Sequence, residues 1–216
     1  MKPQATVVIC TFNRYDLPAQ AITSIELQDF PEDGYELIIG DNSSDLEGRE
    51  RFLDGLEITC NHRYLREPRP GLSRARNAGV SAAAGEIVAF LDDDAKAAPD
   101  WLTHITGTFA QYERAGIAGG PVRPIWAAPR PSWLNPRLES FLSILDRGAE
   151  TRILQAEEWL AGTNVAFRRQ ALEQAGLFPE NLGRIGRVLL SNEELSVSTK
   201  IQELGYDAVY NPKIVV

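Results

Sequence analysis

The 216-residue chain has few cysteines and no long apolar run, and each absence excludes a class of protein. Cys10 and Cys60 are the two cysteines, both in apolar or strand-like stretches, which indicates reduced core thiols in a cytosolic protein. No run of eighteen apolar residues occurs, so we expect no transmembrane helix. The apolar segment after Lys2 is too short for a secretory signal.

The chain also lacks a basic character, repeats, linkers and a glycine-rich loop after its first expected strand. Its net charge of −8 argues against general nucleic-acid binding, although local arginines can still hold a nucleotide. The missing glycine fingerprint excludes a Rossmann dehydrogenase. With 44% hydrophobic and 24% charged residues, the composition is that of a soluble globular protein, and we expect one domain.

The most informative stretch is 86–94, in which five apolar residues run directly into Asp92, Asp93 and Asp94. A short unbroken apolar run is typical of a strand buried on both faces of a parallel sheet. Three adjacent carboxylates repel one another, and a divalent cation with oxygen ligands would relieve the repulsion. In an extended chain Asp92 and Asp94 point to one side and Asp93 to the other. The alternative is a solvated acidic turn that caps the following helix.

Strands and helices alternate four times over the first 120 residues, which predicts an α/β fold with a parallel sheet and right-handed crossovers. The expected strands are 5–11, 35–40, 58–65, 87–91 and 117–122, and the expected helices are 17–28, 46–56, 72–84 and 99–114.

Beyond Pro121 the pattern is irregular, with five prolines by Pro136 and with Trp126 and Trp133 among them. These indoles could line an acceptor groove or pack in the core. Further helices are expected at 136–145 and 192–204, a strand that passes into a helix at 159–176, and a last strand at 206–210.

Six blocks of sequence together resemble the family 2 glycosyltransferases of the GT-A fold, in that family's order and spacing. The resemblance covers nearly the whole chain. The six blocks are Val-Val-Ile-Cys-Thr-Phe-Asn-Arg (7–14), Glu-Leu-Ile-Ile-Gly-Asp-Asn-Ser-Ser-Asp (36–45), Gly-Leu-Ser-Arg-Ala-Arg-Asn-Ala-Gly (71–79), the Asp-x-Asp strand (85–94), Gly-Thr-Asn-Val-Ala-Phe-Arg-Arg (162–169) and Asn-Glu-Glu (192–194).

The resemblance implies a single GT-A catalytic domain over 1–216. A Rossmann-like nucleotide-sugar half (1–120) would be followed by a mixed-sheet acceptor half (121–216). It also implies inverting transfer from a UDP-, dTDP- or GDP-sugar, with Mn²⁺ or Mg²⁺, to a saccharide or lipid-linked acceptor. We expect a role in cell-surface polysaccharide or glycoconjugate synthesis, in the cytoplasm or at the inner membrane face. The chain stops at Val216, directly after its last strand. We therefore expect a C-terminally truncated fragment, with any peripheral membrane association in missing segments.

By the same resemblance, Asp94, with Asp92, would hold the metal. The implied donor-binding residues are Thr11, Asn13, Asp41, Arg66, Arg76, Asp92 and Asp93. Asp41 would accept a hydrogen bond from the base or ribose, although it could equally cap a turn. For at least one of the arginines, a solvated surface charge is the competing interpretation.

Inverting transfer needs one general base, and the resemblance places it in the pair Glu193 and Glu194. Neighbouring helical residues point about 100° apart, so only one can address the acceptor, and we expect Glu194. The second member of this pair is usually aspartate in the family. Asn164 is expected to touch the acceptor or the diphosphate. The alternatives are a metal-dependent phosphohydrolase or nucleotidyltransferase, and a non-catalytic nucleotide-sugar-binding module.

Overall fold

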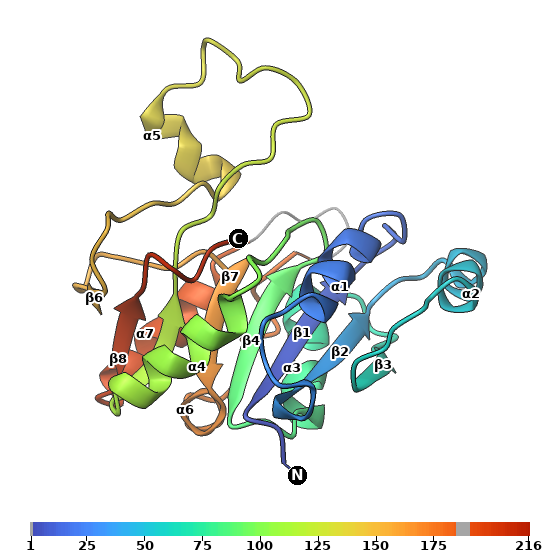
Figure 1. Cartoon of the computed structure of the whole chain (residues 1–216), viewed down its shortest axis with the longest axis horizontal. Helices are drawn as coiled ribbons and strands as arrows, with labels where there is room; N and C mark the ends of the chain where they lie inside the picture. The colour runs from blue at the N-terminus through green and yellow to red at the C-terminus, as the bar shows by residue number, and fades with distance from the viewer. Residues whose placement is uncertain (1, 185–190) are drawn as a thin grey trace.

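The apolar run at Ala5–Thr11 forms β1, the central strand of a parallel set in a larger mixed sheet (Figure 1). The computed structural model describes residues 2–184 and 191–216. Within them, one sheet has the strand order β3-β2-β1-β4-β7-β5-β8-β6. The strands are β1 (Ala5–Thr11), β2 (Tyr35–Asp41), β3 (His62–Arg66), β4 (Ile87–Asp92), β5 (Ala115–Gly119), β6 (Arg152–Ile153), β7 (Asn164–Arg168) and β8 (Asp207–Tyr210).

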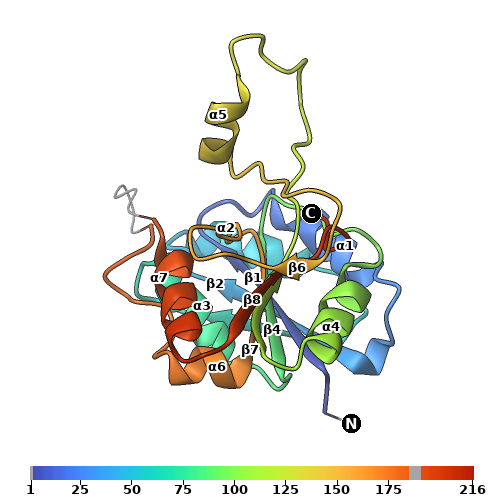
Figure 2. The same cartoon turned by 90° about the vertical axis from the view of Figure 1, so that its left-hand side faces the viewer.

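Helices cover both faces of this sheet (Figure 2). They are α1 (Pro18–Glu26), α2 (Leu46–Asp54), α3 (Leu72–Ala82), α4 (Trp101–Gln111), α5 (Pro136–Glu139), α6 (Arg169–Gln174) and α7 (Glu193–Glu203), with 3₁₀ turns η1 (Glu32–Gly34) and η2 (Ser140–Leu142).

Alternation along the strands separates the core into two clusters. Val7 and Ile9 of β1 face α1 and α4, whereas Val8 between them faces α3, α6 and α7. Successive side chains of a strand point to opposite faces, so an unbroken apolar strand fills both layers at once. The buried-strand interpretation of the apolar runs is therefore confirmed.

The sheet is parallel from β3 to β4 and mixed beyond it. β7 pairs antiparallel with both β4 and β5, so β5 runs in the same direction as β4. The carboxyl ends of β1, β2, β4 and β5 therefore lie at one edge of the sheet, which we call the carboxyl edge.

Several expected bounds are corrected by the structure. The third strand begins at His62 and not at residue 58, because Glu26 accepts hydrogen bonds from the backbone N–H and hydroxyl of Thr59 and holds that segment off the sheet. The helix expected at 136–145 is shorter, and the strand β6 was not expected.

The irregular segment forms a projecting arm, residues 123–144, which rises from the carboxyl edge (Figures 1 and 2). Val122 and Leu145 close its base with two backbone hydrogen bonds. Trp126 and Trp133 are both exposed, so the core-packing alternative for them is wrong.

The remaining sequence expectations concern thiols and membrane spans. Cys10 and Cys60 are free, and burial raises the pKa of Cys10 to about 12, which keeps that thiol protonated and unreactive. No helix in the described parts of the chain is long and apolar enough to cross a membrane.

Candidate functional site

Strand register brings the predicted donor-site positions together at the carboxyl edge. Thr11 pairs with Asp41, and Asp41 pairs with Arg66, across three neighbouring strands. Cys10, one residue before Thr11, pairs with Asp92 on the other side. Such an edge is where open α/β sheets bind their ligands.

The three aspartates differ in exposure, but not through extended backbone, since β4 ends at Asp92 and Asp93 and Asp94 form the turn that follows. Arg14 contacts both of the latter, with Nη1 3.3 Å from Asp94. Asp93 is 2% exposed, and its Oδ1 is 2.5 Å from Nη2 of Arg14. Asp92 and Asp94 are 43% and 51% exposed. Asp93 faces the interior and anchors Arg14 through Oδ1, and the donor contact predicted for Asp93 stays a prediction.

The surroundings of Asp92 and Asp93 at this edge disfavour the ionised forms of their carboxyl groups. Burial raises the pKa of Asp92, which Arg76 lowers in part, and burial also raises the pKa of Asp93, against Arg14. Both carboxyl groups therefore release their protons less readily than an ordinary aspartate. A cation bound beside them would favour their ionised forms.

Asp92 and Asp94 fit a hard divalent cation only in part. Within the described residues, no three His, Cys, Asp or Glu side chains converge as a complete ligand set. Mg²⁺ and similar ions are commonly held by one or two carboxylates, with water and substrate phosphates as the other ligands. Two solvent-accessible aspartates suit that kind of site, which the diphosphate of a donor would complete.

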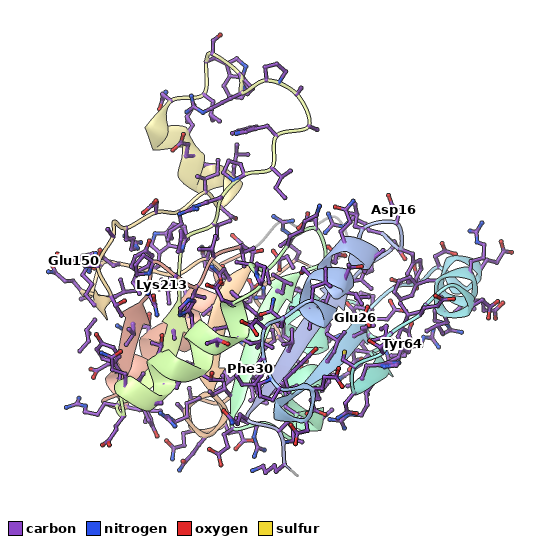
Figure 3. The ribbon with its side chains drawn as sticks, in the orientation of Figure 1. Asp16, Glu26, Phe30, Tyr64, Glu150 and Lys213 are labelled. Carbon is purple, nitrogen blue, oxygen red and sulfur yellow. The ribbon has the colours of Figure 1, made fainter. Side chains whose placement is uncertain are left out.

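Asp41 is fully buried and its carboxylate is engaged. It accepts hydrogen bonds from the hydroxyls of Tyr15 and Tyr64 and from the backbone N–H of Ser43 (Tyr64, on β3, is labelled in Figure 3). The bond from Ser43 makes Asp41 a turn cap, as the alternative interpretation expected, and the bond to a base or ribose stays a prediction. Neither tyrosine was predicted to contact Asp41, because they lie 26 and 23 residues away along the chain.

Asn13 joins the first loop to the loop after β2. Its Oδ1 accepts hydrogen bonds from the backbone N–H groups of Ser44 and Asp45, and its Nδ2 donates to Ser44 Oγ. It has a positive φ of 53°, a backbone conformation that asparagine tolerates well. Next to it, the loop and α2 enclose a cavity of about 390 Å³, lined in part by Tyr15, Arg51 and Phe52.

The two predicted donor arginines differ in position. Arg66 is exposed at the end of β3 and is free to reach a ligand. Arg76 is 4% exposed, with Nη1 2.7 Å from Glu193 and Nη2 3.7 Å from Asp92. The guanidinium of Arg76 is thus buried among carboxylates, and the donor contact predicted for it stays a prediction.

The predicted pair on α7 separates into a structural member and an available one. Glu193 is buried and paired with Arg76, whereas Oε2 of Glu194 has no hydrogen-bond partner. Burial raises the pKa of Glu194; Arg76 lowers it in part, and Glu193 raises it further. A Cβ placed on Gly162 would lie 3.2 Å from Glu194, which locates the carboxylate beside the start of β7.

The side chain of Asn164 makes its hydrogen bonds within the protein. It is fully buried, its Oδ1 accepts from the indole N–H of Trp101, and its Nδ2 donates to the carbonyls of Pro121 and Ile214. Every hydrogen-bonding site of its amide nitrogen is used. The residue therefore joins the base of the arm to the sheet, and the acceptor contact predicted for Asn164 stays a prediction.

Unsatisfied polar atoms concentrate at the same edge. Among the described residues, the buried side-chain oxygens without a hydrogen-bond partner are Thr11 Oγ1, Asp93 Oδ2 and Glu194 Oε2. Such atoms are rare in folded proteins because each loses its hydration, and they point to a place that ligand or water completes.

Comparison with known proteins places the chain in a family. Residues 6–176 match the model of "Glycosyl transferase family 2". The chain belongs to this family. Its fold agrees with solved family relatives: a mannosyltransferase from Pyrobaculum calidifontis, in complex with GDP-Man and Mn²⁺, superposes with a TM-score of 0.71 at 26% identity, over 100% of this chain and 56% of that one.

Two curated relatives are similar to this family 2 chain over most of its length. A glucosyl-dolichyl phosphate glucuronosyltransferase of Haloferax volcanii is 26% identical over 96% of this chain and 66% of its own. The succinoglycan biosynthesis protein ExoM of Rhizobium meliloti is 31% identical over 82% of this chain and 56% of its own. The chain thus spans about two-thirds or less of the relatives it matches.

Proposed function

We propose that this chain transfers a sugar from a nucleotide-diphosphate sugar to an acceptor hydroxyl, with inversion at the anomeric carbon. One observation carries the proposal: the buried oxygens of Thr11, Asp93 and Glu194 that lack a partner all lie at the carboxyl edge, beside the half-buried Asp92 and the exposed Asp94. A candidate site for the metal and the donor therefore lies next to a carboxylate oxygen without a hydrogen-bond partner.

The donor is proposed to bind above β1, β2 and β4. Asp92 and Asp94 would hold Mn²⁺ or Mg²⁺, which when bound neutralises charge on the leaving diphosphate. The GDP-Man and Mn²⁺ bound to the Pyrobaculum relative support a donor and an ion of these classes. Arg66, exposed at the same edge, is placed to contact the donor's base or phosphates.

Glu194 is proposed to take the proton of the acceptor hydroxyl. Its raised pKa makes it a stronger base than an ordinary glutamate once it is ionised, and its Oε2 has no competing hydrogen bond. Glu193 cannot serve equally, because its carboxylate is already paired with Arg76 at 2.7 Å. Arg76 acts through the two glutamates and is a positioning residue.

The acceptor is proposed to be lipid-linked and to be used at the inner face of the membrane. The name of the Haloferax relative includes a dolichyl phosphate acceptor, which supports this class.

The test compares Glu194→Gln with Glu173→Gln, a half-exposed glutamate on α6 that serves as control. Glu194→Gln should leave donor binding unchanged by calorimetry and lower transfer at least 10²-fold, the usual effect of losing a general base. The control should keep near-normal turnover. Near-normal transfer by Glu194→Gln would refute the base assignment, and nucleotide release at the same rate without acceptor would indicate hydrolysis.

The pH dependence of the wild type tests the same residue. A base must be ionised, so kcat/KM should fall as the pH is lowered through the pKa of Glu194. Since burial raises that pKa, the fall should begin at a higher pH than for an ordinary glutamate. A profile that is flat down to pH 4.5 would contradict the proposal.

A further inference from the structure

The arm carries a concentration of exposed apolar side chains that the rest of the described surface lacks. Phe141 is 83% exposed, Ile125 73% and Trp133 70%, and Trp126, Leu138 and Leu142 are also exposed. These six are nearly half of the exposed large hydrophobic residues in the described chain, although the arm is only 22 residues long. Scattered single apolar residues need no explanation, but a continuous set on one segment does.

The core of the protein does not account for these side chains. Both core clusters are built from residues outside 123–144. Figure 3 shows no other element beside the outer part of the arm. The apolar residues of the arm are therefore available to a partner.

The charge of the arm differs in sign from that of the whole chain. Residues 123–144 contain three arginines and one glutamate, which gives +2 within a chain of net charge −8. Arg123 is exposed at the base of the arm. A segment that is both basic and apolar is attracted to a surface that is both negatively charged and apolar. An anionic lipid bilayer has these two properties.

The residue types favour the same partner. Tryptophan combines a large apolar ring with an N–H donor and gathers at membrane–water interfaces, while arginine reaches lipid phosphates. The arm has no helix long enough to span a membrane, and its two short helical turns suit insertion at the depth of the head groups.

We propose that the arm is a membrane-docking element that inserts Trp133, Phe141 and their apolar neighbours into the interface of an anionic bilayer. The arm rises from the carboxyl edge, so docking turns the Asp92 and Glu194 side of the molecule toward the lipid (Figure 1). The binding does not depend on sugar transfer; only its use in meeting a lipid-linked acceptor rests on the proposed function.

The test is co-flotation of the chain with vesicles, without donor or acceptor, so that its result is separate from any test of transfer. Vesicles of phosphatidylcholine with about 30% phosphatidylglycerol are compared with pure phosphatidylcholine. The chain should float with the anionic vesicles and bind the neutral ones several-fold more weakly. The fluorescence of the exposed tryptophans should shift to the blue on binding.

Two double variants make the test specific. Trp133→Ser with Phe141→Ser should weaken vesicle binding about tenfold or more. Leu27→Ser with Leu204→Ser removes two exposed leucines after α1 and α7, at the opposite edge, and should leave binding unchanged. All four positions are exposed, so both variants should fold, which circular dichroism verifies.

Three results would overturn the proposal. They are no flotation of the wild type, equal loss in both double variants, and unchanged binding of the arm variant. A wild-type dimer in sedimentation velocity that the arm variant converts to monomer, without vesicle binding, would assign the arm to a second copy of this chain instead.

Discussion

Arg76 links the aspartate side of the candidate site to the glutamate side through its charge. Its guanidinium contacts Glu193 of α7, lies 3.7 Å from Asp92 of β4, and donates to the carbonyl of Gly162. Phe90 and Phe178 lie 5.6 and 5.4 Å from it and exclude water. Burial lowers the pKa of Arg76, but Asp92, Glu193 and Glu194 raise it by more, so the guanidinium stays charged.

Replacing Arg76 by methionine should destabilise the fold strongly. The change leaves Glu193 buried without a counter-charge, which typically costs about 3–5 kcal/mol in free energy of unfolding. Arg74→Met is the matched control, because Arg74 lies on the same helix and its ion pair with Glu180 is partly exposed. It should cost about 1 kcal/mol or less.

Urea denaturation of both variants measures these differences. A loss for Arg76→Met no larger than that for Arg74→Met would show that the buried network contributes little. Adding Glu193→Gln to Arg76→Met should recover part of the lost stability, because it removes the unpaired charge.

The sequence predicted some of these residues and not others, for a physical reason. The buried strand that ends at Asp92 follows from the apolar run before it, which is a local property, and the structure confirms it. The alternation expected for the three aspartates is wrong, because the chain turns at Asp93 and Asp94 and both contact Arg14. The burial of Arg76 depends on how α3 packs against α7 and Phe178, which is not local. A charged residue in a helix is usually exposed, so its sequence alone indicated a ligand-binding surface.

At the scale of elements, the pattern and the length of the apolar runs in the sequence predicted most strands of the sheet. The unbroken apolar runs of β1, β2 and β4 could be assigned because such strands fill both core layers. The two-residue β6 could not, since its one ladder of pairing with β8 leaves no periodic pattern to detect. The arm was visible only as an irregular proline-rich segment, because its exposed side chains have no period.

The arm should be removable without loss of the fold. Val122 and Leu145 already pair at its base, so replacing residues 124–143 by Asn-Gly should close a short hairpin. Shortening the connection reduces the entropy lost on closing it, by about 0.6 kcal/mol per halving of length. From 20 residues to two this gain adds up to about 2 kcal/mol, so the free energy of unfolding should not fall by more than about 1 kcal/mol below that of the wild type.

Urea denaturation checks the stability, and nucleotide binding by calorimetry checks the donor site in the same variant. Replacing residues 124–143 by the same number of glycine and serine residues is the control for chain length. A loss of more than about 3 kcal/mol would show that the arm supports the core.

For the whole molecule, the candidate site is a region of unfavourable charge that the fold maintains. Burial raises the pKa values of Asp92, Asp93 and Glu194 together. Between the unfolded and folded pKa values the folded chain binds more protons, so these groups make the fold less stable as the pH rises through that range. At neutral pH the molecule therefore carries a destabilisation that a bound cation and diphosphate would relieve.

Nucleotide diphosphate with Mn²⁺ should accordingly raise the thermal midpoint at neutral pH. A ligand at 100 times its Kd stabilises the folded state by about 2.7 kcal/mol, which for a chain of this size corresponds to about 5–10 °C. The shift should shrink when EDTA removes the metal, and Asp94→Asn should abolish the part that depends on Mn²⁺.

The control is Asp33→Asn, which replaces an exposed aspartate on η1 at the opposite edge and should respond like the wild type. Differential scanning fluorimetry with UDP, GDP and dTDP measures each midpoint, and the base that gives the largest shift identifies the donor class. An equal shift with and without metal would show that the nucleotide binds without a metal held by the aspartates. Asp92 and Asp94 would then be part of an acidic turn and not of a metal site.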